Sequence, residues 1–285
     1  MIIMDYNIAK HRIRICGSNE WLNTIKSLEG FIPFQAAEEG TPIAILTDSQ
    51  DAPPTLEEVL YSSDTEQVSN RFGRTATGYL FESTHIDGDK LTVWTNANDS
   101  TTYFQGDMNP QLVRFAIWIA YGIKTIPHQT IAIHTSCIVQ QGKAVIFLGE
   151  SGTGKSTHTR LWREHIEGAF LLNDDSPILR IIDGVPTVFG SPWSGKTPCY
   201  KQEHYPLAAC VRLSQAPYNK ITRLKLVQAY AALHPSCPPD FAYDDQLYDH
   251  ISATLGDILA EVPVYHLACL PDREAALLSH KTVMQ

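Results

Sequence analysis

The chain changes the spacing of its apolar positions along its length. Near the start, Arg12-Ile13-Arg14-Ile15 alternates polar and apolar residues, as a half-exposed strand does. Two further short apolar stretches, 79–82 and 91–94, flank Asp87-Gly88-Asp89, a sequence typical of a hairpin turn. These patterns predict a smaller β-rich N-terminal domain over residues 1–107, which ends in a polar stretch.

Helical spacing begins at Asn109-Pro110, where a helix is predicted with Leu112, Phe115, Ala116 and Ile119 on one face. A strand over 130–139 then turns at Gln140-Gln141-Gly142 into a second strand over 143–148, which predicts an antiparallel hairpin. Further along, strands are predicted over 206–213 and 262–269, helices over 224–233 and 246–261, and a short helix at the end. We therefore expect a second domain, 108–285, of the α/β class with a mixed sheet.

Length, net charge, cysteine spacing and hydropathy all indicate an ordinary soluble globular protein. A chain of 285 residues suits one large or two modest domains, and its formal charge of −9 disfavours nucleic acid or an anionic membrane as a general partner. The six cysteines show no C-x-x-C pair and no zinc spacing, which is typical of free thiols in a reducing compartment. The most apolar window, 112–123, contains Arg114 and is too short to cross a bilayer. We expect a soluble, cytoplasmic protein.

The strand at 143–148 leads into a phosphate-binding motif. The sequence Gly149-Glu150-Ser151-Gly152-Thr153-Gly154-Lys155-Ser156-Thr157 contains the pattern G-x-x-x-x-G-K-S of the P-loop (Walker A), and a helical pattern follows it. The glycines let backbone N–H groups approach phosphate oxygens, and the start of the helix favours an anion. Lys155 adds an ammonium for the β- and γ-phosphates, and the Ser156 hydroxyl suits Mg²⁺. We expect all nine residues to bind ATP.

A second candidate element is the apolar strand 169–175, which ends in Asp174 and Asp175. A P-loop hydroxyl needs a carboxylate from a neighbouring strand to complete a Mg²⁺ site. Successive strand side chains face opposite ways, so the two aspartates should differ in role unless the strand bends. We assign Asp175, with Ser156, to the metal and Asp174 to proton abstraction, although the two carboxylates can also be assigned in reverse order, with Asp174 on the metal.

His134 lies in the predicted strand 130–139, directly before the P-loop hairpin. Two interpretations stay open. A histidine in an apolar strand is commonly a core residue, whereas the strand's position next to the P-loop favours a role at the phosphate site.

These residues together resemble the HPr kinase/phosphorylase and ATP-dependent phosphoenolpyruvate carboxykinase superfamily. The resemblance rests on His134-Thr135-Ser136, on the P-loop and on Asn173-Asp174-Asp175. The segments 190–196 and 262–267 are similar to small HPr kinase-related proteins of bacteria, and the likeness covers roughly residues 108–280. It implies a carboxykinase-like P-loop kinase domain in which the histidine, the P-loop and the aspartate pair converge on the γ-phosphate. It also implies that Lys196 returns to the phosphate or to the phospho-acceptor.

The leading hypothesis is an ATP- and Mg²⁺-dependent kinase, with catalytic residues Asp174, His134 and Lys155. The resemblance implies a serine hydroxyl as acceptor, free or in a peptide. Two alternatives stay open. A carboxykinase-type lyase would release CO₂ from oxaloacetate in a nucleotide-coupled reaction, and a non-catalytic nucleotide-binding module would bind ATP without transferring phosphate. A homo-oligomer is compatible with each of the three.

Overall fold

The computed structural model describes residues 3–37, 40–97, 99–195 and 197–284, which form an α/β protein with two large mixed sheets. Its contacts divide the chain into two compact units. The first unit comprises Met1–His128 together with Pro239–Tyr248, and the second comprises Gln129–Pro238 together with Asp249–Gln285. The units divide after residue 128, whereas the sequence places the boundary after residue 107, so helix α2 (Pro110–Thr125) belongs with the first unit.

The first unit contains a nine-stranded sheet with the order β3-β1-β2-β4-β9-β8-β7-β6-β5. Its strands are β1 (Ile3–Ile8), β2 (His11–Cys16), β3 (Gln35–Ala36), β4 (Ala44–Asp48), β5 (Glu58–Asp64), β6 (Val68–Arg74), β7 (Gly78–His85), β8 (Lys90–Asn96) and β9 (Thr101–Gly106). The predicted strand at 12–15 and the predicted β7–β8 hairpin are confirmed. The basic side chains of β2 pair within the sheet: Arg12 and Arg14 both donate hydrogen bonds to the buried carboxylate of Asp5.

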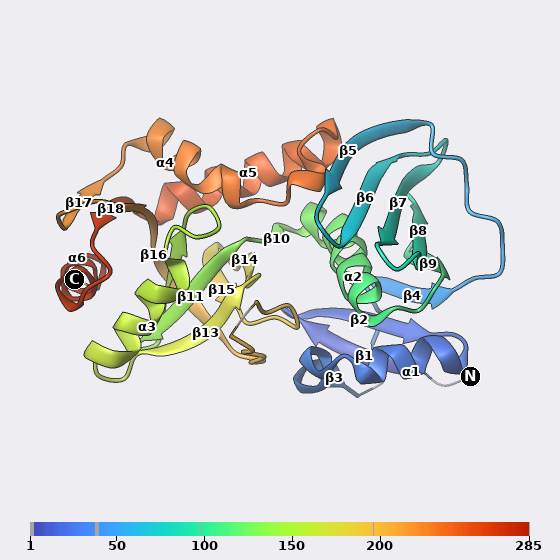
Figure 1. Cartoon of the computed structure of the whole chain (residues 1–285), viewed down its shortest axis with the longest axis horizontal. Coiled ribbons are helices and arrows are strands. Elements are labelled where there is room, and N and C mark those ends of the chain that lie inside the picture. Colours follow the sequence, from blue (N-terminus) through green and yellow to red (C-terminus); the bar gives the residue numbers. More distant parts are fainter. Residues whose placement is uncertain (1–2, 38–39, 98, 196, 285) are drawn as a thin grey trace. The chain divides into compact units, whose positions relative to one another are not determined.

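The described helical segments of this unit include the α-helices α1 (Asn19–Ser27) and α2 and the 3-10 helices η1 (Glu29–Phe34), η2 (Ile126–His128) and η4 (Pro239–Phe241). Asn109 caps α2 by accepting from Gln111 N, as predicted, and α2 packs on β7 and β8. Figure 1 shows α2 next to these strands. Asp244 anchors the later segment 239–248 to the same unit, because its carboxylate accepts hydrogen bonds from Arg74 Nε and Tyr79 Oη at 2.8 and 3.0 Å.

The second unit contains the P-loop and a second nine-stranded sheet, ordered β10-β14-β15-β16-β12-β11-β13, with β18 beside β16 and β17 beside β18. Its strands are β10 (Thr130–Ala132), β11 (Thr135–Gln140), β12 (Lys143–Leu148), β13 (Phe170–Asp175), β14 (Ile178–Ile182), β15 (Val185–Phe189), β16 (His204–Gln215), β17 (Lys220–Arg223) and β18 (Val264–Cys269). Its helices are α3 (Lys155–His165), α4 (Leu226–Leu233) and α6 (Arg273–Val283), and α5 (Asp245–Glu261) begins in the first unit and ends in the second. Strand β12 pairs antiparallel with β11, which confirms the predicted hairpin, and parallel with β16.

The prediction of one continuous strand over 130–139 is wrong. The chain changes partners between Ala132 and Thr135: β10 pairs with β14, whereas β11 pairs with β12 and β13. In the gap, His134 N donates to Ser236 O at 2.7 Å, and the His134 side chain is half exposed. His134 is therefore not a core residue of a strand.

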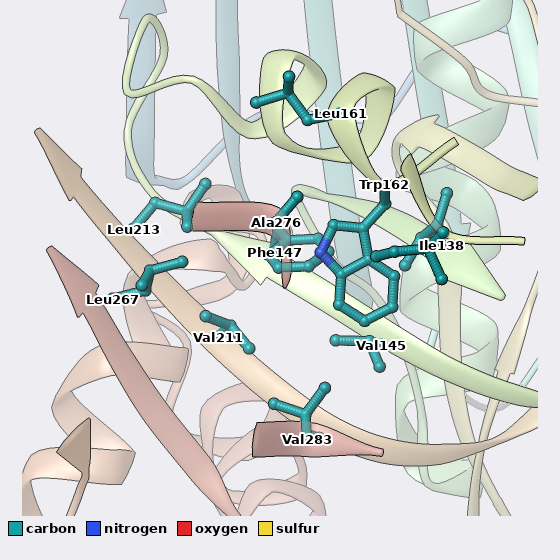
Figure 2. Packing of buried hydrophobic residues seen from close by; sticks show 12 residues of the cluster. Ile138, Val145, Phe147, Leu161, Trp162, Val211, Leu213, Leu267, Ala276 and Val283 are labelled. Carbon is teal, nitrogen blue, oxygen red and sulfur yellow. The ribbon is translucent and has the colours of Figure 1, made fainter. Parts of the chain in front are cut away.

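The core of the second unit fixes the helix that follows the P-loop. Trp162 projects from α3 toward Phe147 and Val145 on β12, as Figure 2 shows, and its ring meets that of Phe147 edge to face with centroids 5.6 Å apart. Its indole Nε1 also donates to Ser279 Oγ on α6 at 2.9 Å. Buried aromatic residues of this size contribute several kcal/mol, roughly 3–5 by the cost of truncating one to alanine. This packing holds α3 against β12 and α6.

Candidate functional site

The P-loop connects the end of β12 at Leu148 to the start of α3 at Lys155. Gly149 has φ +151°, and a Cβ there would lie 3.0 Å from the Thr153 side chain, so this position requires glycine. The loop closes on itself, because Thr153 N and Oγ1 both donate to Glu150 O. Gly154 is the N-cap of α3 and provides no side-chain acceptor for the first N–H groups of the helix. Such N–H groups favour an anion.

The Lys155 ammonium lies across the loop. Its Nζ donates to Gly149 O at 2.6 Å and to Glu150 O at 3.2 Å. The pKa of Lys155 lies below its usual value, chiefly because of burial. Arg212 lowers this pKa further, whereas the nearby carboxylates of Asp175 and Asp174 act to raise it. Both aspartates are thus close enough to Lys155 to act on its charge.

The two aspartates have different partners. Asp174 is buried, and its Oδ1 accepts a hydrogen bond from the P-loop Ser156 Oγ at 3.0 Å. Asp175 is more exposed, and its Oδ1 lies 3.2 Å from His134 Nδ1. Asp175 has φ +156°, an uncommon value for a residue other than glycine. It still pairs with Thr135 of β11, as the last residue of β13.

The segment 190–195 returns to this aspartate pair. Asn173 Nδ2 donates to Trp193 O at 3.0 Å, and Gly195 N donates to Asp174 O at 2.7 Å. A Cβ at Gly195 would approach Asp174 O to 2.9 Å, so only glycine fits without a shift. Trp193 is buried. The predicted phosphate contact of Lys196 lies outside the described residues.

Arg212 was not predicted from the sequence, yet it stands beside the loop. It lies on β16 opposite Leu148 of β12, in a parallel pair. Its Nη1 donates to Ala232 O at 3.2 Å, and its Nη2 lies 3.9 Å from Glu150 Oε1. The sequence does carry an indication, since Arg212 interrupts an apolar stretch between Val211 and Leu213.

Among the residues that the structure describes, no cluster of three or more His, Cys, Asp or Glu side chains forms a metal site. Mg²⁺ in nucleotide-binding sites does not need such a cluster, because one or two carboxylates act with phosphate oxygens and water. Ser156 Oγ and Asp174 Oδ1, 3.0 Å apart, are oxygen donors of the required kind. These two residues fit a cation carried in with a nucleotide.

No protein-family model matches this chain, and a search of curated proteins finds no match either. Within the described ranges, no helix is long and apolar enough to cross a membrane.

Proposed function

We propose that the second unit is an HPr kinase-like P-loop domain that transfers the γ-phosphoryl group of ATP to a hydroxyl. One observation carries the proposal. The Walker A residues Lys155 and Ser156 lie with two carboxylates from a second strand, and each carboxylate has its own partner: Ser156 Oγ for Asp174 and His134 Nδ1 for Asp175. A glycine-rich turn without function would not require this set of charged groups.

The loop and the start of α3 bind the phosphates. Backbone N–H groups of the loop donate to phosphate oxygens, and Lys155 exchanges its bonds to Gly149 O and Glu150 O for bonds to the β- and γ-phosphates. Ser156 and Asp174 would hold Mg²⁺, which would supply positive charge against the triphosphate. Arg212 adds positive charge on the β16 side of the loop.

Asp175 takes the role of general base. Its carboxylate is the more exposed of the pair, and it accepts the proton of the acceptor hydroxyl, while His134 Nδ1 orients it from 3.2 Å. This assignment reverses the order favoured from the sequence, in which Asp175 binds the metal and Asp174 is the base. The Ser156–Asp174 hydrogen bond supports the reversal, because the P-loop hydroxyl and the metal carboxylate must share one cation.

The proposal is tested by incubating the protein with ATP and Mg²⁺ together with free serine and with serine-containing peptides. Mass spectrometry then reports the addition of one phosphoryl group. Asp175→Asn should lower the turnover number by about 10²–10⁴, the usual contribution of a positioned base. Arg160→Ala is the matched control, since Arg160 is exposed on α3 and pairs with Glu164, and it should keep wild-type turnover.

Three results contradict the proposal. Wild-type protein that binds no ATP would rule out the P-loop mechanism. ATP binding without phosphoryl transfer to any acceptor, unaffected by Asp174→Asn, would indicate a nucleotide-binding module. Release of CO₂ from oxaloacetate, dependent on nucleotide, would indicate a lyase.

A further inference from the structure

A cavity of about 510 Å³ adjoins the P-loop on the side of β16 and β18. Its wall begins with the loop itself, at Gly152, Thr153 and Gly154, and continues along α3 through Thr157, His158 and Leu161. The opposite wall consists of the residues at the ends of β16 and β18, namely Leu213, Gln215, Ala216, Cys269, Leu270 and Pro271. This volume lies within the range of roughly 300–1,000 Å³ that small-molecule sites occupy.

The lining differs in character from the phosphate site. Among the described residues that form it there is no Asp, Glu, Lys or Arg, the His158 ring is neutral near pH 7 because burial lowers its pKa to about 4, and three leucines, an alanine and a proline line it. Phosphate groups would not favour such a wall, whereas a flat, neutral aromatic ring buries its faces against apolar side chains at a gain of roughly 25 cal/mol per Å². The cavity therefore suits a part of a ligand that is aromatic and uncharged, next to a loop that suits its phosphates.

The walls are held in place by hydrogen bonds within the unit. Gln215 Nε2 donates to Gly152 O at 3.3 Å, which links the end of β16 to the loop, and Ala216 N donates to Cys269 O at 3.1 Å. Asn219 holds the Leu270 turn, because its Oδ1 accepts from Leu270 N at 2.8 Å and its Nδ2 donates to Asp272 Oδ1 at 3.0 Å. A wall fixed before binding loses little conformational entropy when a ligand enters.

We propose that this cavity binds the base and ribose of the nucleoside triphosphate whose phosphates occupy the P-loop. The inference rests on the proposed function, because it requires a nucleotide at the loop. It adds that affinity for the nucleotide comes from two separable sites: the loop, which binds phosphate, and the wall formed by β16 and β18, which binds the base.

The test compares two ligands by isothermal titration calorimetry in the presence of Mg²⁺: ATP and inorganic triphosphate. Ala216→Trp and, separately, Cys269→Phe place bulk in the cavity without changing a loop residue. Each should weaken ATP binding by about tenfold or more and leave triphosphate binding unchanged. Val227→Trp is the control, because Val227 is 81% exposed on α4, and it should bind both ligands as the wild type does. Circular dichroism checks that each variant is folded.

The outcomes separate the two claims. If the wild type binds neither ligand, the proposed function is wrong, and the cavity inference fails with it. If the wild type binds both ligands with equal affinity, and both cavity variants bind ATP normally, the phosphate loop stands and the base site is overturned. The base site is also overturned if the cavity variants weaken both ligands equally, since the substitutions then act through the loop.

Discussion

Acid should destabilise the second unit through one histidine that sequence reasoning did not single out. His158 lies on α3, is 2% exposed, and its ring meets that of Phe147 edge to face with centroids 4.7 Å apart. Its Nε2 lies 2.9 Å from Ser279 Oγ. Ser279 Oγ also donates to Ala276 O. Burial lowers the pKa of His158 to about 4, so the ring is neutral in the folded state near pH 7.

The sign and size of the effect follow from linkage. The folded-state pKa lies below the unfolded value of 6.5, so the neutral ring's contribution to stability is fully present above pH 6.5 and is lost as the pH falls toward 4. A difference of this size corresponds to roughly 3 kcal/mol when the loss is complete, and to about 2 kcal/mol between pH 7.5 and pH 5.

The perturbation is His158→Gln, which keeps an N–H donor and does not titrate. Hydrogen exchange of the α3 amides in increasing urea reports on the second unit alone. The free energy of opening in the wild type minus that in the variant should fall by about 2 kcal/mol from pH 7.5 to pH 5. The exposed His165 on the same helix is the control, and His165→Gln should retain the pH dependence of the wild type. A wild-type-minus-variant difference that is constant with pH would refute the assignment of a neutral buried ring.

Two further substitutions test other parts of the account. Asp240 is 3% exposed, and burial raises its pKa to about 6, so its contribution to stability is full below pH 3.8 and is lost as the pH rises toward 6. Asp240→Asn should therefore stabilise the first unit by up to about 3 kcal/mol at pH 7 and by nothing at pH 3.5, measured by hydrogen exchange; equal effects at both pH values would contradict this. Gly149→Ala places a side chain at φ +151° against Thr153, at a strain of roughly 1–3 kcal/mol, and should weaken triphosphate binding about tenfold or more; unchanged affinity would show that the loop geometry is not needed.

The elements that the sequence predicts well are those specified by adjacent residues. The turn at Gln141-Gly142 determines the β11–β12 hairpin, because both residues take positive φ, and Asn109-Pro110 determines the start of α2. Helix α1 and the β14–β15 hairpin are not among the predicted elements, although adjacent residues indicate both. Ser18 caps α1, and Asp183-Gly184 forms the turn of the hairpin.

Other features depend on contacts between distant parts of the chain. The interruption at His134 follows from a change of strand partners, and Arg212 reaches the loop through a parallel pairing that no local pattern specifies. The pairing of Ser156 with Asp174 rather than Asp175 depends on the register of β13 on β11, which places Asp174 opposite Ser136 and Asp175 opposite Thr135. Alternation along a strand separates the two carboxylates but does not say which of them faces the P-loop.

Mn²⁺ accepts the oxygen ligands that Mg²⁺ uses, so its binding tests whether Ser156 of the P-loop and Asp174 hold one divalent cation. Electron paramagnetic resonance of Mn²⁺ with saturating ATP measures the affinity of the ternary complex for wild type, Asp174→Asn and Asp175→Asn. We expect Asp174→Asn to weaken Mn²⁺ binding about tenfold or more and Asp175→Asn to change it much less. Equal Mn²⁺ affinity in the wild type and Asp174→Asn would contradict it.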